Sequence, residues 1–140
     1  MASAFPVEGV ELAHVLVVRD IPRARAFYRD VLGARVDSDG QTTCNVRFQG
    51  ARLMLVTGSG PSRDKPGVNF AQPASPYRVS HLITIRVPDC QAAYETLKRR
   101  GAQFLTPPIE WESAVRCFFR DPDGHMLEIS EPRQAPRPRA

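Results

Sequence analysis

The sequence VRDIPRARAFYRDVLG, residues 18–33, contains the pattern that decides the fold. An apolar run leads into it, Asp20 stands where a helix needs an N-cap, and Pro22 suits the first helical turn. The same succession recurs at residues 87–101, VPDCQAAYETLKRRG, with Asp89 as the cap. Each stretch ends in glycine, which readily adopts the left-handed conformation that closes a helix. These matching features predict a tandem repeat with a period of about 70 residues, in which each copy is one supersecondary unit.

Both copies combine one helix with short strands. In each helix, apolar residues at helical spacing form a stripe that should face the core. The stripes consist of Ala24, Phe27 and Val31 in the first copy and of Cys90, Ala93 and Leu97 in the second. Apolar and β-branched runs bounded by turn residues predict the strands. These strands are residues 12–18, 34–37, 42–48 and 52–57 in the first copy and 81–87, 103–106, 114–120 and 126–130 in the second. Each copy is therefore predicted as a βαβββ module, and the fold class as α+β.

The two modules are expected to share one domain over residues 9–131, because a single module is too small to bury a good core alone. Module 1 covers about residues 9–57 and module 2 about residues 79–131. The linker between them, residues 58–78, is rich in Gly, Pro, Ser and Asn. A connection of this length is predicted to be a mobile loop able to cover a site. The alternating prolines and arginines of residues 132–140 predict a disordered tail.

Composition excludes several classes of protein. The net charge of +4 does not indicate nucleic-acid binding, because three arginines lie in the tail and no basic stripe is interleaved with aromatics. No apolar run reaches the roughly 18 residues of a membrane span, and the N-terminus lacks the features of a secretory signal. Three cysteines without CxxC spacing predict reduced thiols and a cytoplasmic location. We interpret Cys44, Cys90 and Cys117 as small buried apolar residues.

Two motifs connect this pattern with a known family. They are FYRDVLG at residues 27–33 and FRDPDG at residues 119–124, followed by Glu128. With these motifs the chain resembles the vicinal oxygen chelate (VOC) superfamily over about residues 9–131. That family includes glyoxalase I, extradiol dioxygenases, fosfomycin-modifying enzymes, methylmalonyl-CoA epimerase and bleomycin resistance proteins. The resemblance implies that the modules form a cupped mixed sheet with the helices outside. It does not specify the reaction, because the family hosts unrelated chemistries on one scaffold.

Glu128 is the candidate catalytic residue. In metal-dependent members of the family, a His on the first strand of each module and a carboxylate on the last strand of one or both hold a divalent ion. Glu128 stands at the carboxylate position relative to Gly124. Strand alternation places it on the cavity face, where a carboxylate without a partner is costly. A salt bridge to Arg86 or Arg116 is the alternative interpretation.

The histidines depart from the family pattern. The family places the strand His seven residues before the capping Asp, whereas His14 is six residues before Asp20 and His81 is eight before Asp89. A one-residue offset turns a side chain to the opposite face of a strand, so both should point toward the helices unless a β-bulge re-aims them. The first module also lacks the carboxylate. His14, His81 and Glu128 are therefore only weak metal candidates; no cofactor is firmly predicted, and a divalent metal stays an open alternative.

The rest of the predicted cavity face is apolar with a few convergent polar groups, which is typical of a small-molecule site. Its candidate ligand-binding residues are Arg86, Thr84, Met54, Arg116, Trp111 and Met126. The two arginines suit a carboxylate or a phosphate. Trp111 and Tyr77 lie on predicted loops, where stacking on a planar ligand and plain loop packing are equally expected. The predicted partner is thus a small organic molecule, anionic or aromatic.

Three functions remain open at this point. The leading hypothesis is a glyoxalase-like or bleomycin-resistance-like protein that binds or transforms a small organic molecule in the cup between the modules, without the complete metal site of the family. The second is a metal-dependent lyase, isomerase or dioxygenase, in which bulges bring the histidines and Glu128 together. The third is a non-catalytic protein that sequesters a drug. The resemblance also implies a homodimer, and the exposed sheet edges of a βαβββ unit give an independent reason to expect one.

Overall fold

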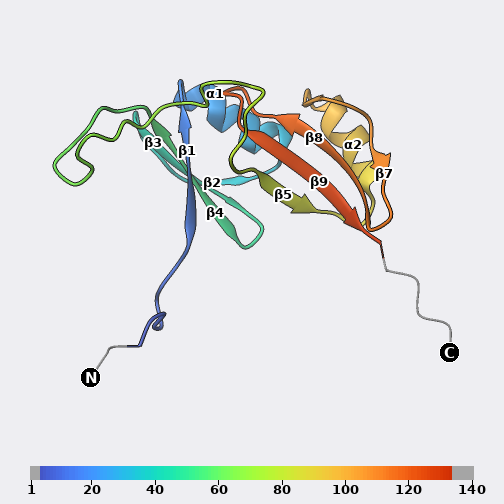
Figure 1. Ribbon diagram of the computed structural model, residues 1–140, viewed down its shortest axis with the longest axis horizontal. Coiled ribbons are helices and arrows are strands. Elements are labelled where there is room, and N and C mark those ends of the chain that lie inside the picture. The colour runs from blue at the N-terminus through green and yellow to red at the C-terminus, as the bar shows by residue number, and fades with distance from the viewer. Residues whose placement is uncertain (1–3, 134–140) are drawn as a thin grey trace.

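Two βαβββ modules follow one another along the chain in the computed structural model, which describes residues 4–133 (Figure 1). The first consists of β1 (Ala13–Val18), α1 (Ile21–Ala26), the π-helical turn η1 (Phe27–Val31), β2 (Arg35–Asp39), β3 (Thr43–Phe48) and β4 (Ala51–Thr57). The second consists of β5 (Ile83–Arg86), α2 (Cys90–Arg99), β6 (Gln103–Phe104), β7 (Ile109–Glu110), β8 (Ala114–Arg120) and β9 (Met126–Pro132). The predicted α+β class is confirmed. None of the described helices is long and apolar enough to cross a membrane.

Each module builds its own sheet with the same topology. The strand orders are β1-β4-β3-β2 and β5-β9-β8-β6, and β7 also pairs with β8. In both sheets the first strand runs parallel to the last strand of the module, and the other pairings are antiparallel. β1 and β5 are edge strands, and within residues 4–133 no ladder joins them. The two modules nevertheless approach one another at His14 and His81, whose ring centroids lie 5.1 Å apart.

The helix ends have the caps that the sequence predicts. Asp20 and Asp89 each accept a hydrogen bond from the backbone N–H three residues later, at 3.3 and 3.0 Å. Gly33 and Gly101 follow the helices with φ angles of 80° and 106°, which is the left-handed region that favours glycine. The repeat in the sequence is therefore also a repeat in the structure.

The second half of the first helix differs from the single regular helix that the sequence predicts between Asp20 and Gly33. After α1 the backbone widens into η1, where the N–H of Leu32 donates to the carbonyl of Phe27, five residues earlier, at 3.2 Å. The wider turn allows the neighbours Phe27 and Tyr28 to be buried together. It also directs the Tyr28 hydroxyl at Asp121 of the second module, with an O–O distance of 2.7 Å.

One hydrophobic core joins the two modules. Its buried residues come from both sheets and both helices. Phe119 of β8 is fully buried, and its ring centroid lies 4.8 Å from that of Phe104 and 6.4 Å from that of Phe27 in η1. The three cysteines are buried and free, as predicted. The modules therefore share their core instead of standing as separate units, as their small size requires.

Several segments differ from their predicted extents. Residues 109–110 were expected to lie in a loop, but they pair with β8 and form the short strand β7. β5 begins at Ile83, so His81 precedes the strand, and β9 continues to Pro132. The linker is partly ordered by bridges within residues 59–70 and crosses the junction of the modules (Figure 1). Residues 134–140 of the predicted tail lie outside the described residues.

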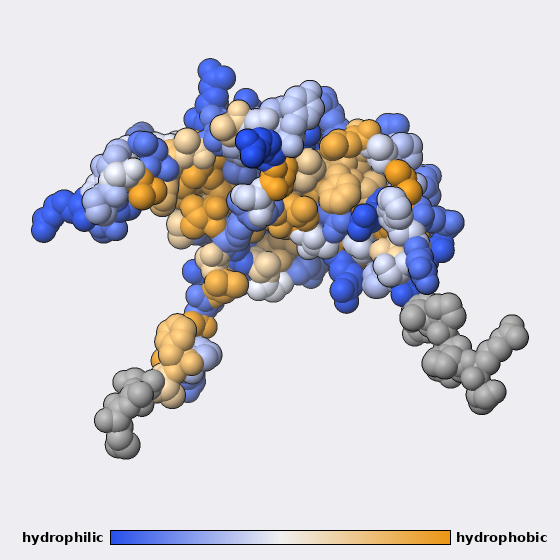
Figure 2. Space-filling view, in the orientation of Figure 1, coloured by the Kyte–Doolittle hydropathy of each residue, from blue (hydrophilic) through white to orange (hydrophobic). Residues whose placement is uncertain are grey.

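The segment before β1 projects away from the rest of the protein (Figure 1). It carries apolar side chains into solvent, which appear as orange surface on the arm in Figure 2. Phe5, Val7 and Leu12 are all exposed, Leu12 at 95 %. Exposed apolar surface of this kind often marks a protein interface.

Candidate functional site

The second sheet presents polar side chains on the face that points away from its helix. On β9, Leu127 and Ile129 are buried, so alternation turns Glu128 to the opposite, open face. The strand register places Thr84 of β5 on one side of Glu128 and Phe118 of β8 on the other. We call this surface the cup face and define it by Thr84, Arg86, Trp111, Arg116, Phe118 and Glu128.

Glu128 is held by two neighbours on the cup face. Its Oε1 accepts a hydrogen bond from the Thr84 hydroxyl at 2.9 Å, and its Oε2 lies 4.0 Å from Nε of Arg116. The Glu128 side chain is 12 % exposed, whereas that of Arg116 is 43 % exposed. Glu128 and Arg116 therefore form the salt bridge that the sequence offered as the alternative, but at the longest distance that still counts as an ion pair. Because the pair is long and Arg116 is half in solvent, it leaves both groups able to meet a ligand.

Arg116 lies between two aromatic rings. The carbon of its guanidinium group is 5.2 Å from the ring centroid of Trp111 and 5.8 Å from that of Phe118. Both distances are within the range of cation–π contact, so the rings hold the planar guanidinium in place. A guanidinium fixed in this way can offer two parallel N–H groups to a carboxylate or a phosphate. The arrangement suits a planar anion that contacts an aromatic surface.

The other predicted ligand-binding residues are distributed over different places. Arg86 lies on the cup face and forms no ion pair within residues 4–133. Met54 lies in the first sheet, on β4. Met126 shares the face of β9 that carries Glu128, and it also lines a cavity at the junction of the modules. The structure thus brings together Thr84, Arg116 and Trp111 around the candidate catalytic carboxylate, and it leaves Met54 apart from them.

The predicted histidine ligands do not fit a metal site with Glu128. His14 pairs with Leu53 on β4, and both belong to the face that carries the buried Leu16. Glu128 points to the opposite face of the other sheet. The bulge that could have re-aimed His14 is absent, because the register of β1 with β4 is unbroken from residue 13 to residue 18. No three His, Cys, Asp or Glu side chains within residues 4–133 are placed to hold a metal ion.

His14 is instead a half-buried residue at the module junction. Its Nε2 is buried and has no hydrogen-bond partner among the described residues. Burial lowers the pKa of His14, and the neighbouring His81 and His125 lower it further. The folded protein therefore resists protonation of His14.

Replacing His14 with leucine should make stability less sensitive to acid. Because the pKa of His14 is lower in the folded protein than in the unfolded chain, the unfolded chain binds a proton more readily than the folded protein does. The contribution of neutral His14 to the free energy of unfolding is therefore complete above about pH 6.5 and is lost as the pH falls. Asp121 acts in the opposite direction, because burial raises its pKa, and it is unchanged in the variant and affects both proteins alike. Melting temperatures between about pH 7.5 and 5.5 should fall less steeply in His14→Leu than in the unmodified protein. Equal slopes would contradict this account of His14.

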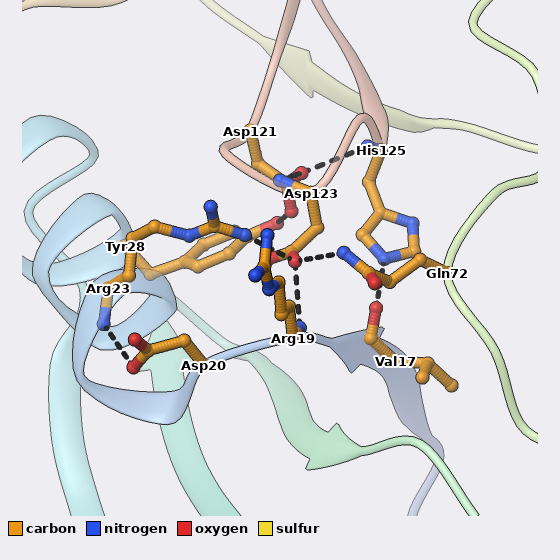
Figure 3. A network of polar contacts seen from close by, with 9 residues as sticks. All are labelled: Val17, Arg19, Asp20, Arg23, Tyr28, Gln72, Asp121, Asp123 and His125. Atoms are coloured by element: carbon orange, nitrogen blue, oxygen red, sulfur yellow. Dashed lines mark hydrogen bonds and ion pairs between the residues drawn. The ribbon is translucent and has the colours of Figure 1, made fainter.

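A buried polar network joins the turn before β9 to the first module (Figure 3). The Oδ1 atom of Asp123 accepts three hydrogen bonds: from the backbone N–H of Arg19 at 2.8 Å, from Nη2 of Arg23 at 2.8 Å and from Nε2 of Gln72 at 2.6 Å. These donors come from the end of β1, from α1 and from the linker. The Asp123 side chain is completely buried. One carboxylate therefore ties three segments to the second module.

Asp121 and His125 complete this network. Asp121 accepts the Tyr28 hydroxyl at 2.7 Å and the backbone N–H groups of Asp123 and His125 at 2.9 Å. Burial raises the pKa of Asp121, and burial followed by the charge of Asp121 raises the pKa of Tyr28. The Nε2 atom of His125 lies 2.7 Å from the Val17 carbonyl oxygen, which can only accept, so Nε2 carries the proton. The sequence places this segment between two predicted strands and contains no signal of the network.

Comparison with known proteins agrees with this architecture. The Glyoxalase/Bleomycin resistance protein/Dioxygenase superfamily matches residues 11–129. The lactoylglutathione lyase of Haemophilus influenzae is 27 % identical over 128 residues, which cover 87 % of this chain and 93 % of that protein. A glyoxalase/bleomycin resistance protein/dioxygenase from Nocardioides superposes with a TM-score of 0.73 at 20 % identity, covering 97 % of this chain and 92 % of that chain. TnmS3, an antibiotic binding protein from Streptomyces sp. CB03234, superposes with a TM-score of 0.64 at 21 % identity, covering 91 % of this chain and 100 % of that chain. At such identities the two structures show the fold, and the family match over most of the chain shows that this protein belongs to the Glyoxalase/Bleomycin resistance protein/Dioxygenase superfamily.

Proposed function

We propose that this protein binds a small planar organic anion on its cup face and does so without a metal ion. The observation that carries the proposal is the position of Arg116 between Trp111 and Phe118, next to Glu128. A positive planar group flanked by aromatic rings recognises both the charge and the flat shape of a ligand. The placement of His14 on the face opposite to the one that carries Glu128 supports the metal-free part of the proposal.

In this proposal each group on the cup face has its own role. Arg116 binds the negative group of the ligand, and Arg86 supplies a second positive charge on the same face. Trp111 contacts the flat part of the ligand. Thr84 orients Glu128 through the hydrogen bond to its carboxylate. If the bound molecule is transformed, Glu128 is the acid–base group, because a carboxylate on an open face can exchange a proton with a ligand.

Binding with turnover and binding alone are distinguished by the fate of the ligand. Similarity to the lactoylglutathione lyase of Haemophilus influenzae supports an enzymatic function, whereas similarity to the Streptomyces antibiotic binding protein supports sequestration of a ligand. The described residues contain no metal cluster that would support the chemistry of a metal-dependent lyase, isomerase or dioxygenase. Formation of any product from a bound compound would exclude pure sequestration, and that product should be lost in Glu128→Gln.

The binding proposal is tested with naphthoate as a planar anion and naphthamide as its neutral counterpart. Calorimetry should show that naphthoate binds at least about tenfold more tightly, since a charge-assisted contact to Arg116 is available only to the carboxylate. Trp111 is the one tryptophan of the chain, so its indole N–H signal reports the location of the ligand. Equal affinity for the two compounds, or binding that leaves the Trp111 signal unchanged, would contradict the proposal.

The expected homodimer and the single domain over residues 9–131 stay predictions. The exposed apolar side chains of the segment before β1 support association, because they have no cover within the described residues. Such a dimer would bury surface that is costly to leave in water.

A further inference from the structure

A cavity lies at the junction of the two modules. It has a volume of about 250 Å³ and lies between the linker and the turn before β9. We call it the junction cavity. Its apolar wall includes Leu16, Leu82, Ile83 and Met126. It contains none of the residues that define the cup face. Because ligand sites for drug-sized molecules measure about 300–1,000 Å³, this cavity suits a smaller molecule.

The linker wall of the junction cavity is fixed to the second module on both sides. Gln72, next to the lining residues 71, 73 and 74, donates to Asp123 at 2.6 Å (Figure 3). Nη2 of Arg120 donates to the carbonyl of Pro76 at 2.8 Å, just before the lining residues 78–83. On the opposite wall, His125 is held by its bond to the Val17 carbonyl at 2.7 Å. The cavity is therefore built by specific polar contacts.

The ionisable groups that line the junction cavity are all basic. They are Arg78, His81 and His125, and none of the lining residues is acidic. Arg78 is exposed and forms no ion pair within residues 4–133. Because Nε2 of His125 donates its N–H to the Val17 carbonyl, Nδ1 of the neutral ring is an acceptor, so His125 offers no N–H to an anion and serves as part of the wall. Arg78 is therefore the fixed positive charge of the cavity, and because no lining carboxylate offsets it, the cavity attracts a ligand of the opposite sign.

We propose that the junction cavity binds a small organic anion with an apolar tail. The negative head group lies against Arg78, with His81 and His125 beside it, and the tail packs against Leu16 and Leu82. The volume and the apolar wall exclude a bare inorganic ion as the best ligand, since an ion would leave that wall in contact with water. The class that fits is a short-chain aliphatic carboxylate. This site is separate from the planar-anion site of the cup face.

Hexanoate tests this proposal, with hexanamide as the neutral counterpart. The chain has three histidines, so single substitutions assign every histidine Cε1–H signal in the NMR spectrum. Titration with hexanoate should shift the signals of His81 and His125 in a saturable way, and hexanamide should bind at least about tenfold more weakly. Arg78→Gln should weaken hexanoate binding by at least about tenfold, because it removes the charged hydrogen-bond donor. The side chain of Arg78 is exposed, so the substitution should not affect folding.

Arg116→Ala is the matched control, because it removes an arginine from the cup face. It should leave the hexanoate affinity unchanged. The proposal is overturned if the His81 and His125 signals do not respond, if Arg78→Gln binds hexanoate as well as the unmodified protein, or if Arg116→Ala abolishes binding, which would place hexanoate on the cup face. Failure of naphthoate to bind would affect only the cup-face proposal, so the two results are distinguishable.

Discussion

Replacing Asp123 with alanine is expected to lower the free energy of unfolding by about 3 kcal/mol. The carboxylate is fully buried and accepts hydrogen bonds from Arg19, Arg23 and Gln72 through one oxygen. Hydrogen bonds to a charged group contribute about 1.5–3 kcal/mol each, but they are not additive when they share an acceptor. Arg23 is 41 % exposed, so it can be rehydrated and its part of the loss is reduced.

Two further variants separate the network from a general effect of losing an acid. Asp123→Asn keeps the accepting oxygen and should lose less stability than Asp123→Ala. Asp30→Ala removes an acid whose partner Arg29 is a surface residue, and it should leave the unfolding transition unchanged. Urea unfolding followed by circular dichroism measures all three. If Asp123→Ala were as stable as Asp30→Ala, the network would not join the modules as described.

Replacing Arg116 with alanine should weaken naphthoate binding by about 10- to 100-fold, because a charge-assisted contact contributes about 1.5–3 kcal/mol. The binding of naphthamide should change far less. Arg116→Lys keeps the charge but loses the planar fork and its stacking on Trp111 and Phe118, so it should fall between the two. Calorimetry gives the affinities directly.

Arg99→Ala provides the control for a general loss of positive charge. Arg99 lies near the end of α2, and its side chain contacts Thr96 on the same helix. This variant should bind naphthoate as the unmodified protein does. An Arg116→Ala protein with undiminished affinity, or an Arg99→Ala protein with an equal loss, would show that naphthoate does not bind where proposed.

Much of the fold could be predicted because its signals are local. Asp20 and Asp89 cap helices within three residues of themselves, and Gly33 and Gly101 end them through their own backbone conformation. The alternation that turns Glu128 away from the core is likewise contained in one strand. The π-helical turn could not be predicted in this way, because it depends on burying Tyr28 against a module that follows it by many residues.

The polar network at the junction had no comparable signal. Arg19 and Asp123 are 104 residues apart, and their contact depends on how the modules dock. The two acids in the turn at residues 121–124 are common turn residues, so they did not indicate buried partners. Phe118 could have been found, because the alternation of β8 places it on the same face as Arg116.

The histidine offset was the most informative single feature of the sequence for function. The register of β1 places His14 beside Leu53 on the helix-packed face, as a one-residue offset predicts. His81 lies close to it, at a ring distance of 5.1 Å, so the two histidines do meet. They meet away from Glu128, and the pairing expected of a metal site is therefore not formed by the described residues.

Metal content and naphthoate binding, measured on the same purified protein, test whether the cup face binds its ligand without a metal ion. We expect far less than one divalent ion per chain by mass spectrometry and an unchanged naphthoate affinity after treatment with a chelator. A divalent ion bound at one per chain, and lost together with naphthoate binding in Glu128→Gln, would contradict this expectation.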